Sequence, residues 1–178
     1  MPIMVQKPKT IGSIMVAVAA VLLITTGAFA YRSWKRSGEI VQPIAFNHQA
    51  HSDKAQIECS ECHAHFSKGA HSGLPTSEVC MTCHADALTK SPEEEKLRRL
   101  VQEGRPVVFR KLFHLPSHVY YSHRRHVVLG KLECKQCHGE IAHTQIPPSR
   151  PLVAISMDFC TDCHKQAKVT NDCKSCHR

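Results

Sequence analysis

The chain of 178 residues has no cysteine outside one repeated pattern. Its ten cysteines form five Cys-x-x-Cys pairs, each followed at once by histidine. Disulfide bonding does not require a histidine after each pair, and zinc sites combine Cys-x-x-Cys units in twos, which an odd number does not allow cleanly. The absence of any leftover cysteine and the odd count therefore argue against a disulfide scaffold and against zinc ribbons.

The spacing within each unit has a chemical reason. Two residues between the thiols let both sulfurs form thioethers with the vinyl groups of one haem, while the adjacent histidine ligates the iron on its proximal side. The pattern therefore predicts five covalently bound haem c groups. The expected attachment residues are Cys59, Cys62, Cys80, Cys83, Cys134, Cys137, Cys160, Cys163, Cys173 and Cys176. The expected proximal ligands are His63, His84, His138, His164 and His177.

The chain also has few residues for each of these groups. After the apolar segment that ends at Ala30, about 148 residues remain for five haems, roughly 30 for each, which is too few for an ordinary apolar core. We expect a mainly α fold with extensive irregular loops and little or no sheet. The haems would form much of its core, so the chain would not fold without them.

Charged residues are absent from the segment between Ile11 and Ala30. About 20 apolar residues are long enough to cross a membrane as a helix. The alternative is a cleaved signal peptide, because Ala28-Phe29-Ala30 resembles a cleavage site, but its apolar region is usually only about 7–15 residues. We expect a retained anchor, with residues 1–31 forming a short cytoplasmic N-terminus and a transmembrane helix, and residues 32–178 forming the haem domain.

An internal repeat relates two parts of this domain, residues 46–84 and 121–164. Phe46-x-His48-x-x-His51 precedes the first haem motif, and an equivalent pattern 75 residues later precedes the third. Two histidines three positions apart project at different angles and can reach two different haems. The predicted distal iron ligands of four haems are therefore His48, His51, His123 and His126. The fifth motif, 173–177, is appended to the second copy.

The sixth ligand of the fifth iron is less strongly indicated. We select His114, in Phe113-His114-Leu115-Pro116, over the remaining histidines. Met157 is the rival, because a thioether ligand would raise the potential of that haem above its bis-histidine neighbours. The histidines set aside are His65, His71, His118 and His143. Six-coordinate iron at every site would leave no open position for substrate, which favours electron transfer over catalysis.

A helix is predicted between the two halves. Ser91 is placed as its N-cap, Pro92 at its first position, and Glu94 as the residue that completes a capping box. Gly104 would end it. Leu97 and Leu100 share one face, so the helix is expected to pack on the haem domain.

The formal charge of +8 does not indicate nucleic-acid binding. Five haems would add ten propionate charges, and each oxidised iron-porphyrin core would return about one positive charge. We therefore expect a holoprotein near neutrality and no nucleic-acid partner.

These motifs resemble those of two protein families. Phe46-Asn-His48-Gln-Ala-His51 ahead of Cys59 resembles class III cytochromes of the c3/c7 type. A longer set of motifs resembles the pentahaem cytochrome c component of alternative complex III, and it consists of Phe113 to Pro116, Tyr120 to His126, Gly130, Cys134 to Gly139 and Met157 to His164. This resemblance covers most of residues 44–178, although Glu140, His143 and Thr144 occupy a stretch where such proteins often carry proline and methionine.

The resemblance implies an electron-transfer subunit of a quinol-oxidising respiratory or photosynthetic complex. Its implied partners are a monohaem cytochrome c or terminal oxidase, an iron-sulfur/molybdopterin-like subunit, and a quinol-binding integral membrane subunit. Because c-type thioethers form outside the cytoplasm, the haem domain is expected on the periplasmic side of the bacterial inner membrane. A related assembly built around a different oxidoreductase would fit equally well.

Two other functions stay open. A quinol dehydrogenase resembling the NapC/NrfH type would be reduced directly by quinol, and would need a weakly ligated haem near the anchor. No quinol pocket is evident between Trp34 and Pro43. A redox enzyme with one five-coordinate haem is the third possibility.

Overall fold

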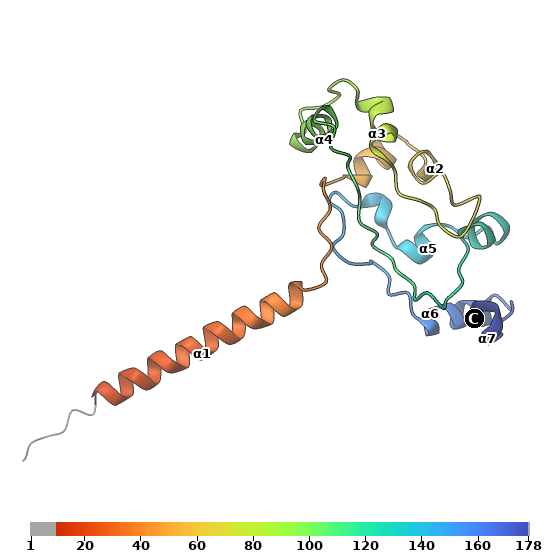
Figure 1. Ribbon diagram of the computed structural model, residues 1–178. Coiled ribbons are helices and arrows are strands. Elements are labelled where there is room, and N and C mark those ends of the chain that lie inside the picture. The colour runs from red at the N-terminus through yellow and green to blue at the C-terminus, as the bar shows by residue number, and fades with distance from the viewer. Residues whose placement is uncertain (1–9, 178) are drawn as a thin grey trace, which may run out of the picture. The chain divides into compact units, whose positions relative to one another are not determined.

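The computed structural model describes residues 10–177 and divides the chain into two compact units, which meet between Glu39 and Ile40. The described part of the first unit, residues 10–39, contains one helix, and the second unit contains short helical segments joined by irregular loops (Figure 1). Residues 1–9, which were predicted to form most of a short cytoplasmic N-terminus, lie outside the part of the chain that the structure describes. In chain order the segments are α1 (Thr10–Arg36), η1 (Ala50–Lys54), α2 (Cys59–Cys62), α3 (Ser77–His84), α4 (Pro92–Gln102), η2 (Arg124–Leu129), α5 (Lys135–His138), η3 (Ile141–His143), α6 (Met157–Gln166) and α7 (Cys173–Cys176).

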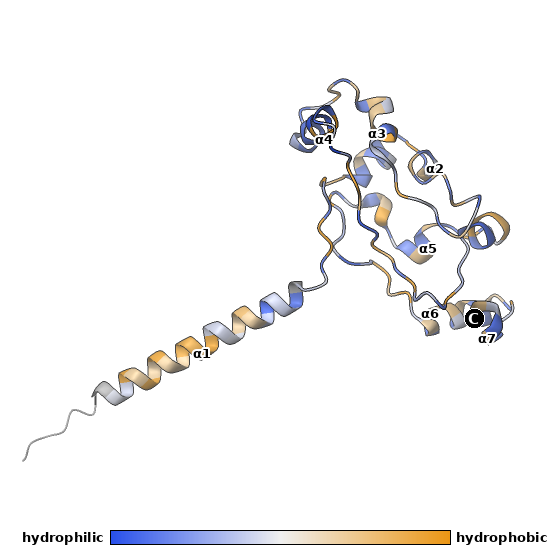
Figure 2. Ribbon diagram, in the orientation of Figure 1, coloured by the Kyte–Doolittle hydropathy of each residue, from blue (hydrophilic) through white to orange (hydrophobic). Residues whose placement is uncertain are grey.

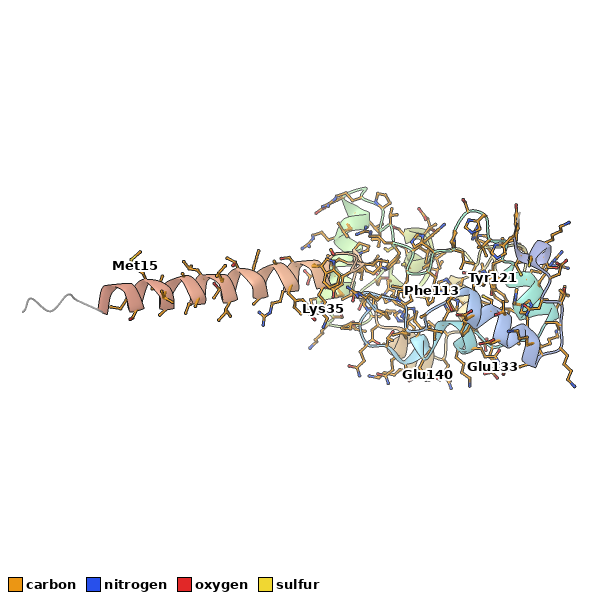
Figure 3. All side chains as sticks on the ribbon, turned by 90° about the horizontal axis from the view of Figure 1, so that it is seen from below. Met15, Lys35, Phe113, Tyr121, Glu133 and Glu140 are labelled. Atoms are coloured by element: carbon orange, nitrogen blue, oxygen red, sulfur yellow. The ribbon has the colours of Figure 1, made fainter. Side chains whose placement is uncertain are left out.

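Helix α1 is long and apolar enough to cross a membrane. With a mean hydropathy of 2.2 over its most apolar 18 residues, the candidate span Gly12–Lys35 has 24 residues. At about 1.5 Å per residue it measures about 36 Å, more than a hydrocarbon core of about 30 Å. Apolar side chains such as Met15 project from the helix and are exposed, and their hydropathy distinguishes α1 from the mixed second unit (Figures 2 and 3).

The second unit is helical, and the prediction of a mainly α fold is confirmed. Among residues 10–177 no strand occurs, and one isolated antiparallel bridge pairs Val119 with His177. Few side chains are buried: of those that the structure describes, the buried hydrophobic ones are Ile44, Leu97 and Val107. They form a small cluster between the start of the unit and α4.

Residues 75 positions apart form two similar turns before the first and third motifs. The Phe46 ring stacks on His51 with centroids 4.3 Å apart, and the Tyr121 ring stacks on His126 at 4.5 Å. Each turn ends at a residue with positive φ, Gln56 at 53° and Lys131 at 56°. The closing hydrogen bonds are also equivalent, from Ile57 N to His51 O and from Leu132 N to His126 O. The two segments therefore share one local structure.

Hydrogen bonds between the two halves are reciprocal. Gln49 N donates to Thr144 O at 3.1 Å, and Arg124 N donates to Gly69 O at 3.2 Å. Adding 75 to Gln49 gives Arg124, and subtracting 75 from Thr144 gives Gly69. Each turn thus docks on the loop after the other half's first motif, as in an isologous interface. This reciprocal pairing is the pattern expected of two halves related by an approximate two-fold axis.

The connecting helix α4 forms as predicted, but its capping differs. The Ser91 hydroxyl accepts a hydrogen bond from Glu93 N, and Gly104 follows the helix end with φ of +68°. The predicted capping box is wrong, because Ser91 N donates to the Thr89 hydroxyl instead of to Glu94. The carboxylate of Glu94 is turned away to other partners. Helix α4 packs against α3.

Candidate haem-binding sites

Each Cys-x-x-Cys pair lies on or at the edge of a helical segment. Residues three positions apart on a helical turn lie on one face, so each pair presents both sulfurs to the same side. The longer segments have defined starts, such as α6, where the Ser156 hydroxyl accepts a hydrogen bond from Phe159 N at 3.1 Å. All ten thiols are free, and all are exposed or half-buried. The local structure therefore leaves every cysteine available for a thioether bond.

The histidines of the motifs and turns are oriented through one ring nitrogen. A carbonyl can only accept, so an Nδ1 that contacts a backbone oxygen carries the hydrogen and leaves Nε2 with a free lone pair. This contact occurs at His51, His63, His123, His126 and His164, over 2.6 to 2.9 Å. The Thr144 hydroxyl donates to Ile141 O, so its oxygen accepts from His48 Nδ1 at 3.3 Å. This is the tautomer required for iron ligation through Nε2.

Most proximal histidines face a second histidine ring. Two imidazoles bound to one iron at about 2.0 Å, each nitrogen about 1.1 Å from its ring centre, place the ring centres about 6 Å apart. The observed pairs are His51–His84 at 6.1 Å, His123–His138 at 6.2 Å, His126–His164 at 6.1 Å and His118–His177 at 5.6 Å. Three of these contain a histidine predicted as distal from the turns.

For the remaining proximal histidine, His63, the neighbouring histidine is His48, because the charge of His63 is one cause that lowers the pKa of His48. Burial, followed by the charges of His63 and His51, lowers the pKa of His48 to about 4. His138, which corresponds to His63 in the other half, has its pKa lowered by burial and then by His123 and His63. A lowered pKa favours the neutral form of both imidazoles, which is the form that binds a metal.

The fifth proximal histidine faces a residue that the sequence did not single out. The bridge between Val119 and His177 brings His118 onto the His177 ring, with an interplanar angle of 26°. His114, the predicted ligand, instead directs Nε2 at Lys111 O, 3.0 Å away. Met157 is 65% exposed at the first position of α6. No sequence pattern predicts the His118 contact, because it depends on a backbone pairing between distant segments.

The other histidines lack this arrangement. His143 is engaged through both nitrogens, with Asp53 at 3.1 Å and Glu140 at 3.6 Å. The side-chain hydrogen bond from His143 is the main cause that lowers the pKa of Asp53. His65 and His71 are exposed in the loop after the first motif.

The residues present fit haem groups in two further respects. The second unit has very few buried apolar side chains for its length, so large apolar cofactors are needed to complete its core. The Nε of Arg98 on α4 is buried and has no hydrogen-bond partner, an unusual state that a haem propionate would satisfy. Both observations favour porphyrins over small metal ions. Among residues 10–177, no three His, Cys, Asp or Glu side chains converge as ligands of one ion.

The five thiol pairs form a continuous series of neighbours. Burial is the main cause that raises the pKa of Cys80, Cys137 and Cys160, and neighbouring thiols add to it. Cys62 acts on Cys80, Cys163 and Cys160 act on Cys137, and Cys176 acts on Cys160. Cys59 and Cys134, which are equivalent in the repeat, contact one another. The spatial order of the motifs is thus second, first, third, fourth, fifth, and it runs from α3 past α2 and α5 to α6 and α7 (Figure 1).

Comparisons with known proteins identify the family of this chain. The family model of cytochrome c7 and related cytochrome c matches residues 119–178, and that of the class III cytochrome c family matches residues 30–108. The multihaem cytochrome c subunit of menaquinone reductase from Nitratidesulfovibrio vulgaris is 31% identical over 144 residues, covering 76% of this chain and 67% of the relative. The chain belongs to the class III/c7-type multihaem cytochromes c. As a member, this cytochrome binds haem c covalently.

Proposed function

We propose that this cytochrome is a five-haem electron-transfer subunit of a quinone-linked membrane oxidoreductase complex. The observation that carries the proposal is the uninterrupted series of five motif sites, each with its thiols next to those of the following site. Bound haem iron takes up and releases one electron at a time. Residues that hold such groups side by side provide a path from α3 to α7.

Each site is assigned one proximal and one distal histidine. Thioethers come from the ten cysteines, and the proximal ligands are the histidines that follow them. The proposed pairs are His63 with His48, His84 with His51, His138 with His123, His164 with His126, and His177 with His118. His118 replaces His114 and Met157 in this assignment. Two protein ligands on every iron leave no position for substrate, so the subunit itself is not catalytic.

The anchor is proposed to be α1, and the haem unit to begin at Ile40. The sequence suggested a boundary after Tyr31, but α1 continues to Arg36 and the second compact unit starts after Glu39. The haem unit would lie on the periplasmic side of the inner membrane, because thioether formation occurs there. Residues 1–9 would then be cytoplasmic.

The parent complex is proposed to exchange electrons with the quinone pool. The relative from Nitratidesulfovibrio vulgaris is a subunit of a menaquinone reductase, while the motif resemblance is to the pentahaem component of alternative complex III. The alternative complex III assignment implies two neighbouring subunits, of which one is an integral membrane protein that binds quinone and the other is iron-sulfur/molybdopterin-like. A monohaem cytochrome c would be a further partner in the second assignment.

Purification of the tagged, full-length chain from its native membrane tests the proposal. Five haems per chain are expected from mass spectrometry and the pyridine haemochrome assay, together with the integral membrane and iron-sulfur/molybdopterin-like subunits. A monohaem cytochrome in the complex would favour the alternative complex III assignment. Recovery of the chain alone, or with fewer than five haems, would refute the proposal.

Reduction by a quinol analogue separates this proposal from a NapC/NrfH-type quinol dehydrogenase. The relay subunit is expected to be reduced rapidly within the complex and only slowly when purified by itself. Rapid reduction of the isolated subunit would show that it contains its own quinol site and would overturn the relay assignment.

A further inference from the structure

Among the histidines of the motifs and turns whose Nδ1 has a hydrogen-bond partner, His84 differs from the others in the acceptor of its Nδ1 hydrogen. At five of them this acceptor is a backbone carbonyl, and at His48 it is a hydroxyl. His84 Nδ1 instead lies 3.0 Å from Oε1 of Glu94 on α4. A carboxylate is a stronger acceptor than either group, so the environment of the second haem site is chemically distinct.

Glu94 is held firmly in this position. Its side chain is only 6% exposed. Oε1 also accepts a hydrogen bond from Leu88 N at 2.7 Å, and Oε2 accepts from Thr89 N at 2.8 Å and from the Thr89 hydroxyl. A carboxylate with four donors around it has little freedom to move. The hydrogen bonds from Leu88 and Thr89 therefore fix the carboxylate in its contact with His84, unlike a mobile side chain on the surface.

The equivalent site in the other half lacks a carboxylate. His164 belongs to the second motif of that half, as His84 does in the first, and its Nδ1 donates to Thr170 O at 2.6 Å. The repeat therefore offers an internal comparison: two related sites share a bis-histidine arrangement and differ in the group behind the proximal ring.

The acceptor behind a ligating imidazole changes how strongly the ring donates to iron. A carboxylate draws the Nδ1 hydrogen more strongly than a carbonyl does and makes the ring more basic. A more basic ligand stabilises the ferric over the ferrous state, and the carboxylate charge acts in the same direction. We propose that Glu94 is a positioning residue that, through His84, lowers the reduction potential of the haem held by Cys80 and Cys83.

This proposal rests on the proposed function only for the presence of haem at the second motif. That motif is one terminus of the series of sites, next to α4. A lowered potential there makes an electron easier to pass on to the neighbouring site at Cys59 and Cys62. Within the cytochrome, Glu94 thus favours electron flow away from α3.

A redox titration of the full-length holoprotein followed by visible spectroscopy tests the inference. In Glu94→Gln the amide still accepts a hydrogen bond but lacks the charge, and one of the five transitions is expected to move to higher potential. A tenfold change in the equilibrium constant for reduction of that haem corresponds to about 59 mV for one electron. Glu95→Gln is the matched control, since it removes the same charge from the next, exposed residue and should leave all transitions in place.

Two further variants separate tuning from loop structure. Thr89→Val removes the hydroxyl that contacts Glu94 but keeps the carboxylate, so the potential should stay near that of the native protein. Glu94→Asp keeps the charge on a shorter side chain and is expected to shift the same transition less than Glu94→Gln does. If Glu94→Gln does not retain haem, Glu94→Asp is the variant that tests the inference. Equal shifts in Thr89→Val and Glu94→Gln, or no shift in either Glu94 variant, would overturn the inference. Haem content of the native protein, measured first, tests the proposed function separately.

Discussion

Replacement of His118 by alanine should change the spin state of a single iron. The His118 and His177 ring centres are 5.6 Å apart, close to the roughly 6 Å that two imidazoles on one iron require. His114 lies four residues earlier, and its Nε2 contacts the Lys111 carbonyl at 3.0 Å. The two positions therefore provide a matched pair of substitutions, of which only His118→Ala is expected to remove an iron ligand.

The magnitude follows from the number of sites. With five haem motifs in the chain, loss of one distal ligand converts one fifth of the iron from low spin to high spin. An EPR spectrum of the oxidised, full-length protein measures this fraction against the haem content of the same sample. His114→Ala should retain entirely low-spin iron, and native protein should as well.

The opposite result would refute the reasoning. High-spin iron in His114→Ala, with none in His118→Ala, would mean that bound haem rearranges the segment from Phe113 to Val119. High-spin iron in neither variant would assign the sixth ligand elsewhere, with Met157 the first candidate. High-spin iron in the native protein would support the alternative of an enzyme with an open haem.

Three further substitutions test the fold. Gly73 has φ of +81°, and an added Cβ would lie 2.8 Å from a ring carbon of His65. Gly73→Ala should therefore lower the free energy of unfolding of the holoprotein, measured with denaturant, by about 1–2 kcal/mol. The control Gly69→Ala, at a position with open space for the Cβ, should lower it clearly less. Leu97→Ala removes one of the few buried apolar side chains and should lower the free energy of unfolding by about 2–4 kcal/mol, a loss that unchanged stability would contradict. Burial raises the pKa of Tyr121 to about 12; because an unfolded tyrosine ionises near pH 10, native stability should fall as pH rises from about 10 to 12. In Tyr121→Phe, which copies Phe46 of the other half, part of this alkaline loss should disappear in unfolding curves measured against pH.

Local chemistry explains why so much of this cytochrome could be predicted. Attachment of haem requires two thiols and a histidine within five consecutive residues, so the motifs can be recognised in the sequence without any tertiary structure. The same holds for α4, whose N-cap at Ser91 and ending at Gly104 are local signals. The turns around His51 and His126 also depend on nearby residues, which is why a sequence offset of 75 corresponds to one repeated geometry.

Contacts between distant segments could not be predicted in this way. Glu94 has the spacing of a capping-box residue, yet it bonds His84 and the loop at Leu88 because α4 packs against α3. A capping box and a ligand-orienting carboxylate have the same sequence signature, and only packing decides between them. The contact of His118, and not of His114, with the His177 ring likewise depends on the pairing of Val119 with His177.

The five motifs could be recognised without a structure, because the residues for covalent attachment and proximal ligation lie within one short peptide. The helical character of the chain and the repeat of two histidine-bearing turns could also be predicted from local patterns. The facing histidines, the spatial order of the motifs and the carboxylate behind His84 were visible only in the folded chain. Those features arise where segments far apart in the chain come together, through reciprocal docking of the two halves and the closing bridge near the C-terminus.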